Sequence, residues 1–164
     1  MKFLRGFKYA FRGIIYCVNN ERNMRIHTVV ALYALVLSPF FELSRTKYAV
    51  LLLTISGVFA AEMVNTAVEE LCDLSSAEYN PMARVTKDVA AGAVLIGAIF
   101  SVVVGICLFW QPAAFLRMFD YFAGKPWMLC LLLLSLALAL IYVVLGPIGI
   151  RDRLRGKKAN APKK

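Results

Sequence analysis

Four apolar stretches, separated by short polar segments, dominate the pattern of the chain. They cover residues 28–41, 48–72, 89–110 and 127–150. A transmembrane helix needs about 20 mostly apolar residues, and all but the first stretch meet this length. The connection at 42–47 is short, which makes the first two spans antiparallel neighbours. The pattern therefore predicts an all-α integral membrane helical bundle.

The segment before the first span has a helical amphipathic pattern. Between residues 3 and 15 the apolar side chains fall on one face, and Arg5, Lys8 and Arg12 fall on the other. Such a helix lies in the membrane interface, with its aromatic side in lipid and its basic side toward anionic headgroups. Two roles stay open for it: membrane anchoring alone, or anchoring combined with contact between a phosphorylated ligand and Tyr9, Arg12 or both.

The distribution of basic residues gives the expected orientation in the membrane. The chain has 19 Lys and Arg residues against 10 Asp and Glu. Six of the basic residues precede His27, two lie in a polar segment at 74–87 that predicts a loop, and seven follow Ile150. These 15 of 19 lie on one side of a four-span arrangement, as in the cytoplasmic segments of membrane proteins. We therefore expect a multi-pass protein of the cell membrane with both termini in the cytoplasm, and no binding of nucleic acid.

The second span carries acidic side chains, which an apolar helix seldom contains. A carboxylate at the centre of a membrane helix costs about 2.5–3.5 kcal/mol on insertion scales, so acids found there are candidates for a functional site. At about 100° per residue, one face collects four oxygen-bearing side chains within ~80°, and Glu70 points to a flank. We call these four the acidic stripe: Glu62, Asn65, Glu69 and Asp73. The rise of the helix places Glu62 about 16 Å inward from Asp73.

The residue types in the acidic stripe indicate metal-dependent chemistry. Carboxylates and amides suit Mg²⁺, which proteins hold with one or two carboxylates plus substrate phosphates. Arg84 and Lys87, in the predicted loop, could hold those phosphates, and Glu62 could take a proton from a lipid hydroxyl. The combination predicts phosphoryl transfer at a membrane surface. Neither a P-loop nor a kinase-type G-x-G-x-x-G motif occurs in the chain.

Two other functions fit the same acids. An ion or proton channel or transporter could use Glu62, Glu69 and Glu70 as a pathway. The other spans, however, supply no matching series of ionisable groups. A non-catalytic subunit could use the acids for assembly, but this hypothesis leaves Lys87 and Asp88 unexplained.

Three segments resemble the signature of the small prokaryotic diacylglycerol kinase and undecaprenol kinase family. They are Glu-Met-Val-Asn-Thr-Ala-Val-Glu at 62–69, Glu-Tyr at 78–79 and Lys-Asp-Val-Ala-Ala-Gly-Ala-Val at 87–94. The resemblance runs from near Phe7 to near Trp110. The segment Asn-Glu-Arg-Asn-Met-Arg-Ile-His at 20–27 is more similar to the undecaprenol kinase branch than to the diacylglycerol kinase branch.

The resemblance implies a homotrimer of three-span subunits, each with an interfacial helix, that uses ATP as co-substrate and Mg²⁺ as metal. By position, Glu62 would be the catalytic base, supported by Asn65. Taken alone, Glu21 reads as a solvated ion-pair partner, but the resemblance makes Glu21 and Glu69 the metal ligands. The residues implied around the nucleotide are Tyr9, Glu78, Tyr79, Asn80, Lys87 and Asp88. Supporting positions are Arg12, Asp73 and Arg84. The acceptor would be a membrane lipid alcohol, namely undecaprenol, with diacylglycerol as the alternative.

The chain departs from the family pattern near the predicted loop and at its end. Family members often have His where this chain has Asn80, and Arg-Ala where it has Val85-Thr86, so Arg84 would take over the missing charge. The fourth span lies outside the three-span pattern. The expected organisation has three parts: a membrane lipid kinase domain at 1–110, an outer interfacial segment with an extra transmembrane helix at 111–150, and a basic cytoplasmic tail at 151–164.

Overall fold

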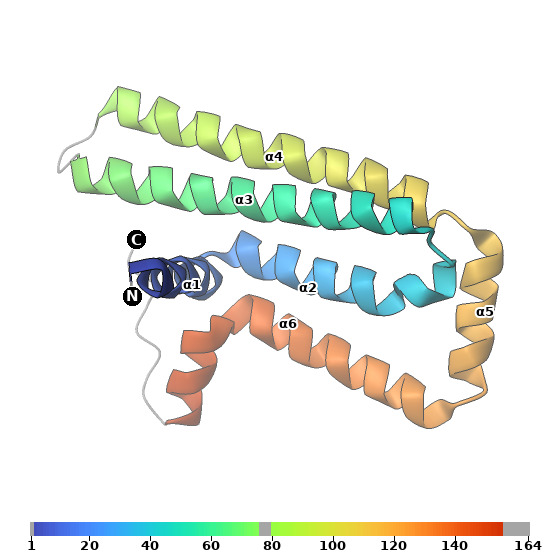
Figure 1. Ribbon diagram of the computed structural model, residues 1–164. Coiled ribbons are helices and arrows are strands. Elements are labelled where there is room, and N and C mark those ends of the chain that lie inside the picture. The colour runs from blue at the N-terminus through green and yellow to red at the C-terminus, as the bar shows by residue number, and fades with distance from the viewer. Residues whose placement is uncertain (1, 76–79, 156–164) are drawn as a thin grey trace. The chain divides into compact units, whose positions relative to one another are not determined.

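Helices and the turns between them make up the residues described by the structure, a computed structural model, which are 2–75 and 80–155 (Figure 1). In chain order the elements are α1 (Lys2–Asn20), α2 (Arg22–Leu37), the 3-10 helix η1 (Ser38–Phe41), α3 (Arg45–Ser75), α4 (Pro81–Phe109), α5 (Pro112–Ala123) and α6 (Pro126–Leu154). In the described part of the chain, four helical segments are long and apolar enough to cross a membrane: Arg22–Phe41, Arg45–Leu74, Pro81–Phe109 and Pro126–Leu154. The prediction of an all-α membrane bundle with four spans is confirmed.

The chain divides into two compact units. The first unit comprises Met1–Val29 and Phe122–Lys164, and the second unit comprises Val30–Tyr121. The first unit therefore holds α1, the beginning of α2, and α6. The second unit holds the rest of α2, η1, α3, α4 and most of α5.

The predicted loop at 74–87 is wrong. Helix α3 continues to Ser75 and α4 already begins at Pro81, so Arg84, Lys87 and Asp88 are helical. The reason lies in the helix start: the side chain of Asn80 accepts hydrogen bonds from the first free backbone N–H groups of α4, and Pro81 occupies the first helical position. Polarity alone suggested a loop, whereas this capping pair starts a helix there.

Other helices are also longer than their apolar patterns. The interfacial helix predicted at 3–15 continues to Asn20, and the first span begins at Arg22 rather than at residue 28. At the other end of the chain, α6 includes Arg151 and Arg153, the first basic residues of the predicted tail. Hydropathy locates the part of a helix that lies in lipid, but the backbone hydrogen bonds continue into polar flanks.

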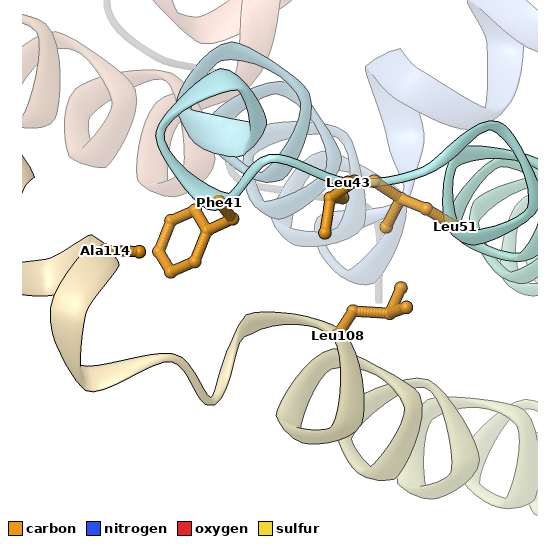
Figure 2. Close-up of a cluster of buried hydrophobic side chains, with 5 residues drawn as sticks. All are labelled: Phe41, Leu43, Leu51, Leu108 and Ala114. Carbon is orange, nitrogen blue, oxygen red and sulfur yellow. The ribbon is translucent and has the colours of Figure 1, made fainter.

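In the second unit, α3 and α4 run antiparallel and side by side (Figure 1). A small core closes this unit at the end where α3 begins and α4 ends. Its buried side chains are Phe41, Leu43, Leu51, Leu108 and Ala114 (Figure 2). The ring of Phe41 meets the rings of Phe109 and Phe115 edge to face, with centroids 4.9 and 5.2 Å apart. Helix α5, which the sequence suggested only as an interfacial segment, is thus attached to the span ends through aromatic packing.

The turn between η1 and α3 is held by a contact from α5. Pro39 lies within η1, and Glu42 adopts a left-handed conformation with φ 48° that ends it. The guanidinium of Arg117 donates to the carbonyl oxygen of Phe40 at 3.0 Å and lies 3.3 Å from the carboxylate of Glu42. Ser44 then caps α3 by accepting a hydrogen bond from the backbone N–H three residues on. These contacts set the position at which α3 begins.

In the first unit, α6 has a break close to its C-terminal end. Gly146 has φ 66° and ψ 167°, which is not a helical conformation, and Pro147 follows it. Figure 1 shows the last turns of α6 running in a different direction from the rest of the helix. Helices α1 and α6 contact each other within this unit.

Replacing Phe41 by Ala is expected to lower the free energy of unfolding by about 3–5 kcal/mol, because the buried ring would leave a cavity beside Phe109 and Phe115. Titration of the detergent-solubilised protein with SDS, followed by circular dichroism, measures this free energy. Phe100→Ala is the matched control, since Phe100 is 65% exposed and its loss should change stability by about 0.5 kcal/mol or less. Equal losses for the two variants would contradict the packing role of Phe41.

Candidate functional site

The acidic stripe lies along α3 and passes from buried to exposed positions. Glu62 is 1% exposed and Asn65 is 7% exposed. Glu69 is half-buried, and the side chain of Asp73 is 69% exposed. The stripe thus has a buried inner end, where a carboxylate is shielded from water, and an open outer end near the connection to α4.

A direct hydrogen bond joins two members of the stripe. The amide Nδ2 of Asn65 donates to Oε1 of Glu69 at 2.7 Å, one helical turn away. This bond fixes the orientation of the amide, so its Oδ1 points elsewhere. That oxygen is buried, and it accepts no hydrogen bond from residues 2–75 or 80–155. A buried carbonyl oxygen without a donor is costly, so the site has an acceptor ready for a ligand hydroxyl, a water or a cation.

Thr66 is a buried polar neighbour of the stripe that the sequence reasoning did not single out. It is 3% exposed, and its hydroxyl donates to the backbone carbonyl of Glu62 at 2.9 Å. Threonine commonly makes this bond to the carbonyl one turn earlier in a helix. The spacing of four residues from Glu62 was the available signal, although it does not distinguish a functional threonine from an ordinary one.

The outer end of the stripe is linked to α4. The ammonium of Lys87 donates to a carboxylate oxygen of Asp73 and forms an ion pair with it. Arg84 and Asp88 are exposed on α4 and lie three residues before and one residue after Lys87. Residues three and four apart share a helix face, so Arg84 neighbours both Lys87 and Asp88. The structure therefore brings the predicted cationic residues to the open end of the stripe, on a helix rather than on a loop.

Asn80 has a structural role in the observed fold. Its Oδ1 accepts from the backbone N–H of Met82 at 2.9 Å and from that of Ala83 at 3.4 Å. The side-chain oxygen is therefore engaged as a helix cap, and the residue as a whole is exposed. The neighbouring candidates Glu78 and Tyr79 lie outside the described residues.

Three candidate residues belong to the first unit. Tyr9 is 63% exposed on α1, and Arg12 is exposed one turn further on. Glu21 lies between α1 and α2, where its backbone N–H donates to the carbonyl of Cys17 at 2.8 Å. Glu21 also makes a further polar or electrostatic interaction, so it is not a free side chain.

The side-chain oxygens on α3 suit a hard cation that is coordinated partly by the protein and partly by a bound ligand. No group of three or more His, Cys, Asp or Glu side chains converges on one point among the residues described. Mg²⁺, however, typically takes only one or two carboxylates and completes its shell with phosphate oxygens and water. Glu69 and the unengaged Oδ1 of Asn65 provide oxygen donors of this kind.

Comparison with known proteins identifies relatives over the first two thirds of the chain. The family model described as "Prokaryotic diacylglycerol kinase" matches residues 8–109. An undecaprenol kinase from Bacillus subtilis (strain 168) is 36% identical over 108 residues, which are 66% of this chain and 88% of that protein. A diacylglycerol kinase from Synechocystis sp. is 40% identical over 110 residues, which are 66% of this chain and 63%, less than two thirds, of that protein.

A more distant relative covers the same region. The diacylglycerol kinase of Escherichia coli (strain K12) is 26% identical over 110 residues, which are 67% of this chain and 90% of that protein. The family match ends at the last residue of α4. Helices α5 and α6 therefore lie beyond it.

The capping role of Asn80 predicts a specific stability pattern. Asn80→Ala should lower the free energy of unfolding by about 1 kcal/mol, because the first turn of α4 loses its side-chain acceptor. Asn80→Asp keeps an acceptor oxygen and should retain the stability of the unaltered protein. SDS titration gives both free energies, and amide hydrogen exchange at Met82 and Ala83 locates the effect. If the Ala and Asp variants were equally stable, the cap would contribute nothing.

Proposed function

The chain belongs to the prokaryotic diacylglycerol kinase family, and on that premise we propose that it transfers the γ-phosphate of ATP to undecaprenol. Members of this family and the relatives found are lipid kinases, so the chain is a membrane lipid kinase that uses ATP. The observation that carries the proposal is the acidic stripe on α3, which lies inside the family match and holds a buried carboxylate together with an amide that is hydrogen-bonded to a second carboxylate. An ion-conducting function has no support among the relatives.

The choice of acceptor is supported by one relative and opposed by another. The undecaprenol kinase of Bacillus subtilis is matched over 88% of its length, and the segment 20–27 resembles that branch. The Synechocystis diacylglycerol kinase is slightly more identical, at 40%, over a smaller share of its length. Diacylglycerol therefore remains the second candidate acceptor, with phosphatidic acid as the product.

In the proposed reaction, Glu62 accepts the proton of the lipid hydroxyl. The hydroxyl oxygen forms a bond to the γ-phosphorus, and the bond from that phosphorus to the β-phosphate bridging oxygen breaks to release ADP. Burial of Glu62 at 1% exposure keeps water away from its carboxylate and suits a base that serves a lipid substrate. Asn65 holds Glu69 through its Nδ2 and offers its Oδ1 to the reacting groups.

Glu69, together with Glu21 and the phosphates of ATP, is proposed to hold Mg²⁺. When bound, the ion would neutralise charge on the phosphate oxygens. The nucleotide is proposed to lie among Tyr9, Glu78, Tyr79, Asn80, Lys87 and Asp88, with Arg12, Asp73 and Arg84 in support. The ion pair between Lys87 and Asp73 supports a role for Lys87 at the open end of the stripe.

The organisation of the protein is proposed to follow the family. The kinase occupies residues 1–110 and assembles as a homotrimer, followed by an outer interfacial segment and an extra transmembrane helix at 111–150 and a basic tail at 151–164. Both termini lie in the cytoplasm in this proposal, because most basic residues flank the spans on that side. The cytoplasmic side is also where ATP is found.

Glu62→Gln should lower turnover by about 10²–10⁴-fold, the usual contribution of a general base, and should leave the dissociation constant of MgATP largely unchanged. Glu69→Gln should instead raise that dissociation constant, because a metal ligand is lost. Transfer of labelled phosphate and equilibrium binding of MgATP measure the two effects. Glu70→Gln, an exposed position on the flank of the same helix, is the matched control and should turn over normally. Ordinary turnover in Glu62→Gln would refute the assignment of the base.

A side-by-side assay of undecaprenol and diacylglycerol in mixed micelles tests the acceptor. We expect at least a tenfold larger kcat/KM for undecaprenol, a preference that corresponds to about 1.4 kcal/mol of transition-state binding. Product chromatography of labelled phosphate gives both rates with the same protein. A larger kcat/KM for diacylglycerol would replace undecaprenol by the second candidate and leave the proposed chemistry of α3 intact.

A further inference from the structure

Arg25, near the beginning of α2, contacts two other helices of the first unit. Its side chain is charged, yet the residue is only 7% exposed. Nη1 donates to the carbonyl oxygens of Val18 and Asn19, at 3.3 and 3.0 Å, in the last turn of α1. Nε donates to the carbonyl oxygen of Val143 in α6 at 3.2 Å. One guanidinium thus joins the end of α1, the start of α2 and the turn of α6 just before its break.

The break in α6 supplies the acceptor on that helix. In an unbroken α-helix the carbonyl of residue 143 would accept from the N–H of residue 147. Residue 147 is proline, which has no N–H, so the carbonyl of Val143 is released. The carbonyls of Val18 and Asn19 are available for a similar reason, because the last turn of a helix lacks intrahelical donors. Arg25 therefore donates to backbone carbonyls that have no intrahelical donor, at the end of α1 and before the break in α6.

Gly146 allows the close approach of the guanidinium. A Cβ atom at this position would lie 3.1 Å from Cζ and 3.1 Å from Nη1 of Arg25, which is tighter than ordinary contact. Its φ of 66° is also a conformation that other residues rarely adopt. The Gly146-Pro147 pair thus provides both the space and the free carbonyl that Arg25 uses.

Within residues 2–75 and 80–155, the hydrogen-bond partners of the Arg25 guanidinium are backbone carbonyls. No carboxylate among the residues described forms an ion pair with it. The C-terminal end of α1 carries the negative end of the helix dipole, which favours a cation. A buried cation that loses these acceptors is costly, so the three hydrogen bonds form an interaction that resists separation of α6 from α1.

Helix α1 depends on this attachment because little else in the first unit covers it. Every residue from Phe3 to Arg12 is exposed, and the first buried side chain is that of Cys17. The part of α1 from residue 8 lies inside the family match, whereas α6 lies outside it. The contact therefore joins a helix of the kinase region to a helix that the family match does not include.

We propose that Arg25 is a positioning residue that fastens α6 to the junction of α1 and α2, and that lipid kinase turnover depends on the resulting position of α1. The proposal rests on the membership of the chain in a lipid kinase family and is independent of which lipid is the acceptor. It gives the additional helix a role in the reaction, exerted through α1 rather than through contact with substrate.

Pro147→Ala in the full-length protein tests the attachment. The new N–H can donate to the carbonyl of Val143, which lets α6 continue without a break and deprives Arg25 of its acceptor. Amide hydrogen exchange of the protein in lipid nanodiscs should then be about tenfold faster in the last turns of α1, since the local opening free energy falls. The amides of α3 and α4 provide an internal reference and should keep their rates. Unchanged exchange in α1 would overturn the attachment.

Turnover measurements test the second part of the proposal, which is that lipid kinase turnover depends on the attachment of α6. Pro147→Ala and Gly146→Ala should lower kcat/KM for ATP severalfold, because displacement of α1 moves Tyr9 and Arg12, which are proposed to lie near the nucleotide, while the stripe on α3 is intact. Gly149→Ala is the matched control: it lies in the same helix, its Cβ would meet only Leu145 Cβ at an ordinary 3.6 Å, and it should match the unaltered protein. Normal kcat/KM for ATP in Pro147→Ala, despite faster exchange in α1, would overturn the dependence of turnover on the attachment.

A double variant shows whether the effects share one cause. Arg25→Lys keeps the charge but cannot reach three acceptors with a planar fork of donors, so it should speed exchange in α1. Adding Arg25→Lys to Pro147→Ala should cause little further change. Additive effects would show that Arg25 acts elsewhere and would refute the proposal. If the unaltered protein phosphorylated no lipid, the proposed function would fail, while the exchange rates would still decide the attachment.

Discussion

The cost of keeping carboxylate and amide groups inside an apolar helix determines how the second unit is arranged. Glu62 and Asn65 are buried on α3, a helix that is long and apolar enough to cross a membrane. Burial of such groups is tolerated only where each has a partner or a ligand to bind. The hydrogen bond from Asn65 to Glu69 and the increasing exposure toward Asp73 meet this requirement in part. The site is therefore a row of polar side chains that begins at buried Glu62 and ends at exposed Asp73, which forms an ion pair with Lys87 of α4.

Much of this arrangement was predictable because it follows from periodicity and hydropathy. The four spans, the helical face shared by the acidic residues and the amphipathic first helix all follow from side-chain spacing along a helix. The family resemblance added the residues that it implies around a nucleotide. The assignments of Glu62, Glu69 and Lys87 to catalytic, metal and nucleotide roles stay predictions until they are measured.

Other features could not be predicted from side-chain polarity. The polar segment 74–87 suggested a loop, although the pair Asn80-Pro81 is a recognisable helix start and could have indicated α4. The contact of Arg25 with Val143 joins residues 118 positions apart, and only the folded chain brings them together. The attachment of α5 through Phe41 and Arg117 is of the same kind. Neighbouring residues in the sequence determine where a helix forms. The contacts of Arg25, Phe41 and Arg117 depend instead on which segments come together in the folded chain.

The position of the break in α6 has a consequence for the membranes in which the protein can function. About 20 residues separate Pro126 from Gly146, and at 1.5 Å per residue they extend about 30 Å, close to the thickness of a hydrocarbon core. A continuous helix adapts to a thicker or thinner bilayer by tilting or sliding, at a modest cost per ångström of mismatch. Because the break is fastened to its neighbours at one end, this helix has little freedom to slide. We therefore expect this helix to adapt to bilayer thickness by tilting rather than by sliding, so that lipid tail length becomes a physical variable to which the protein responds.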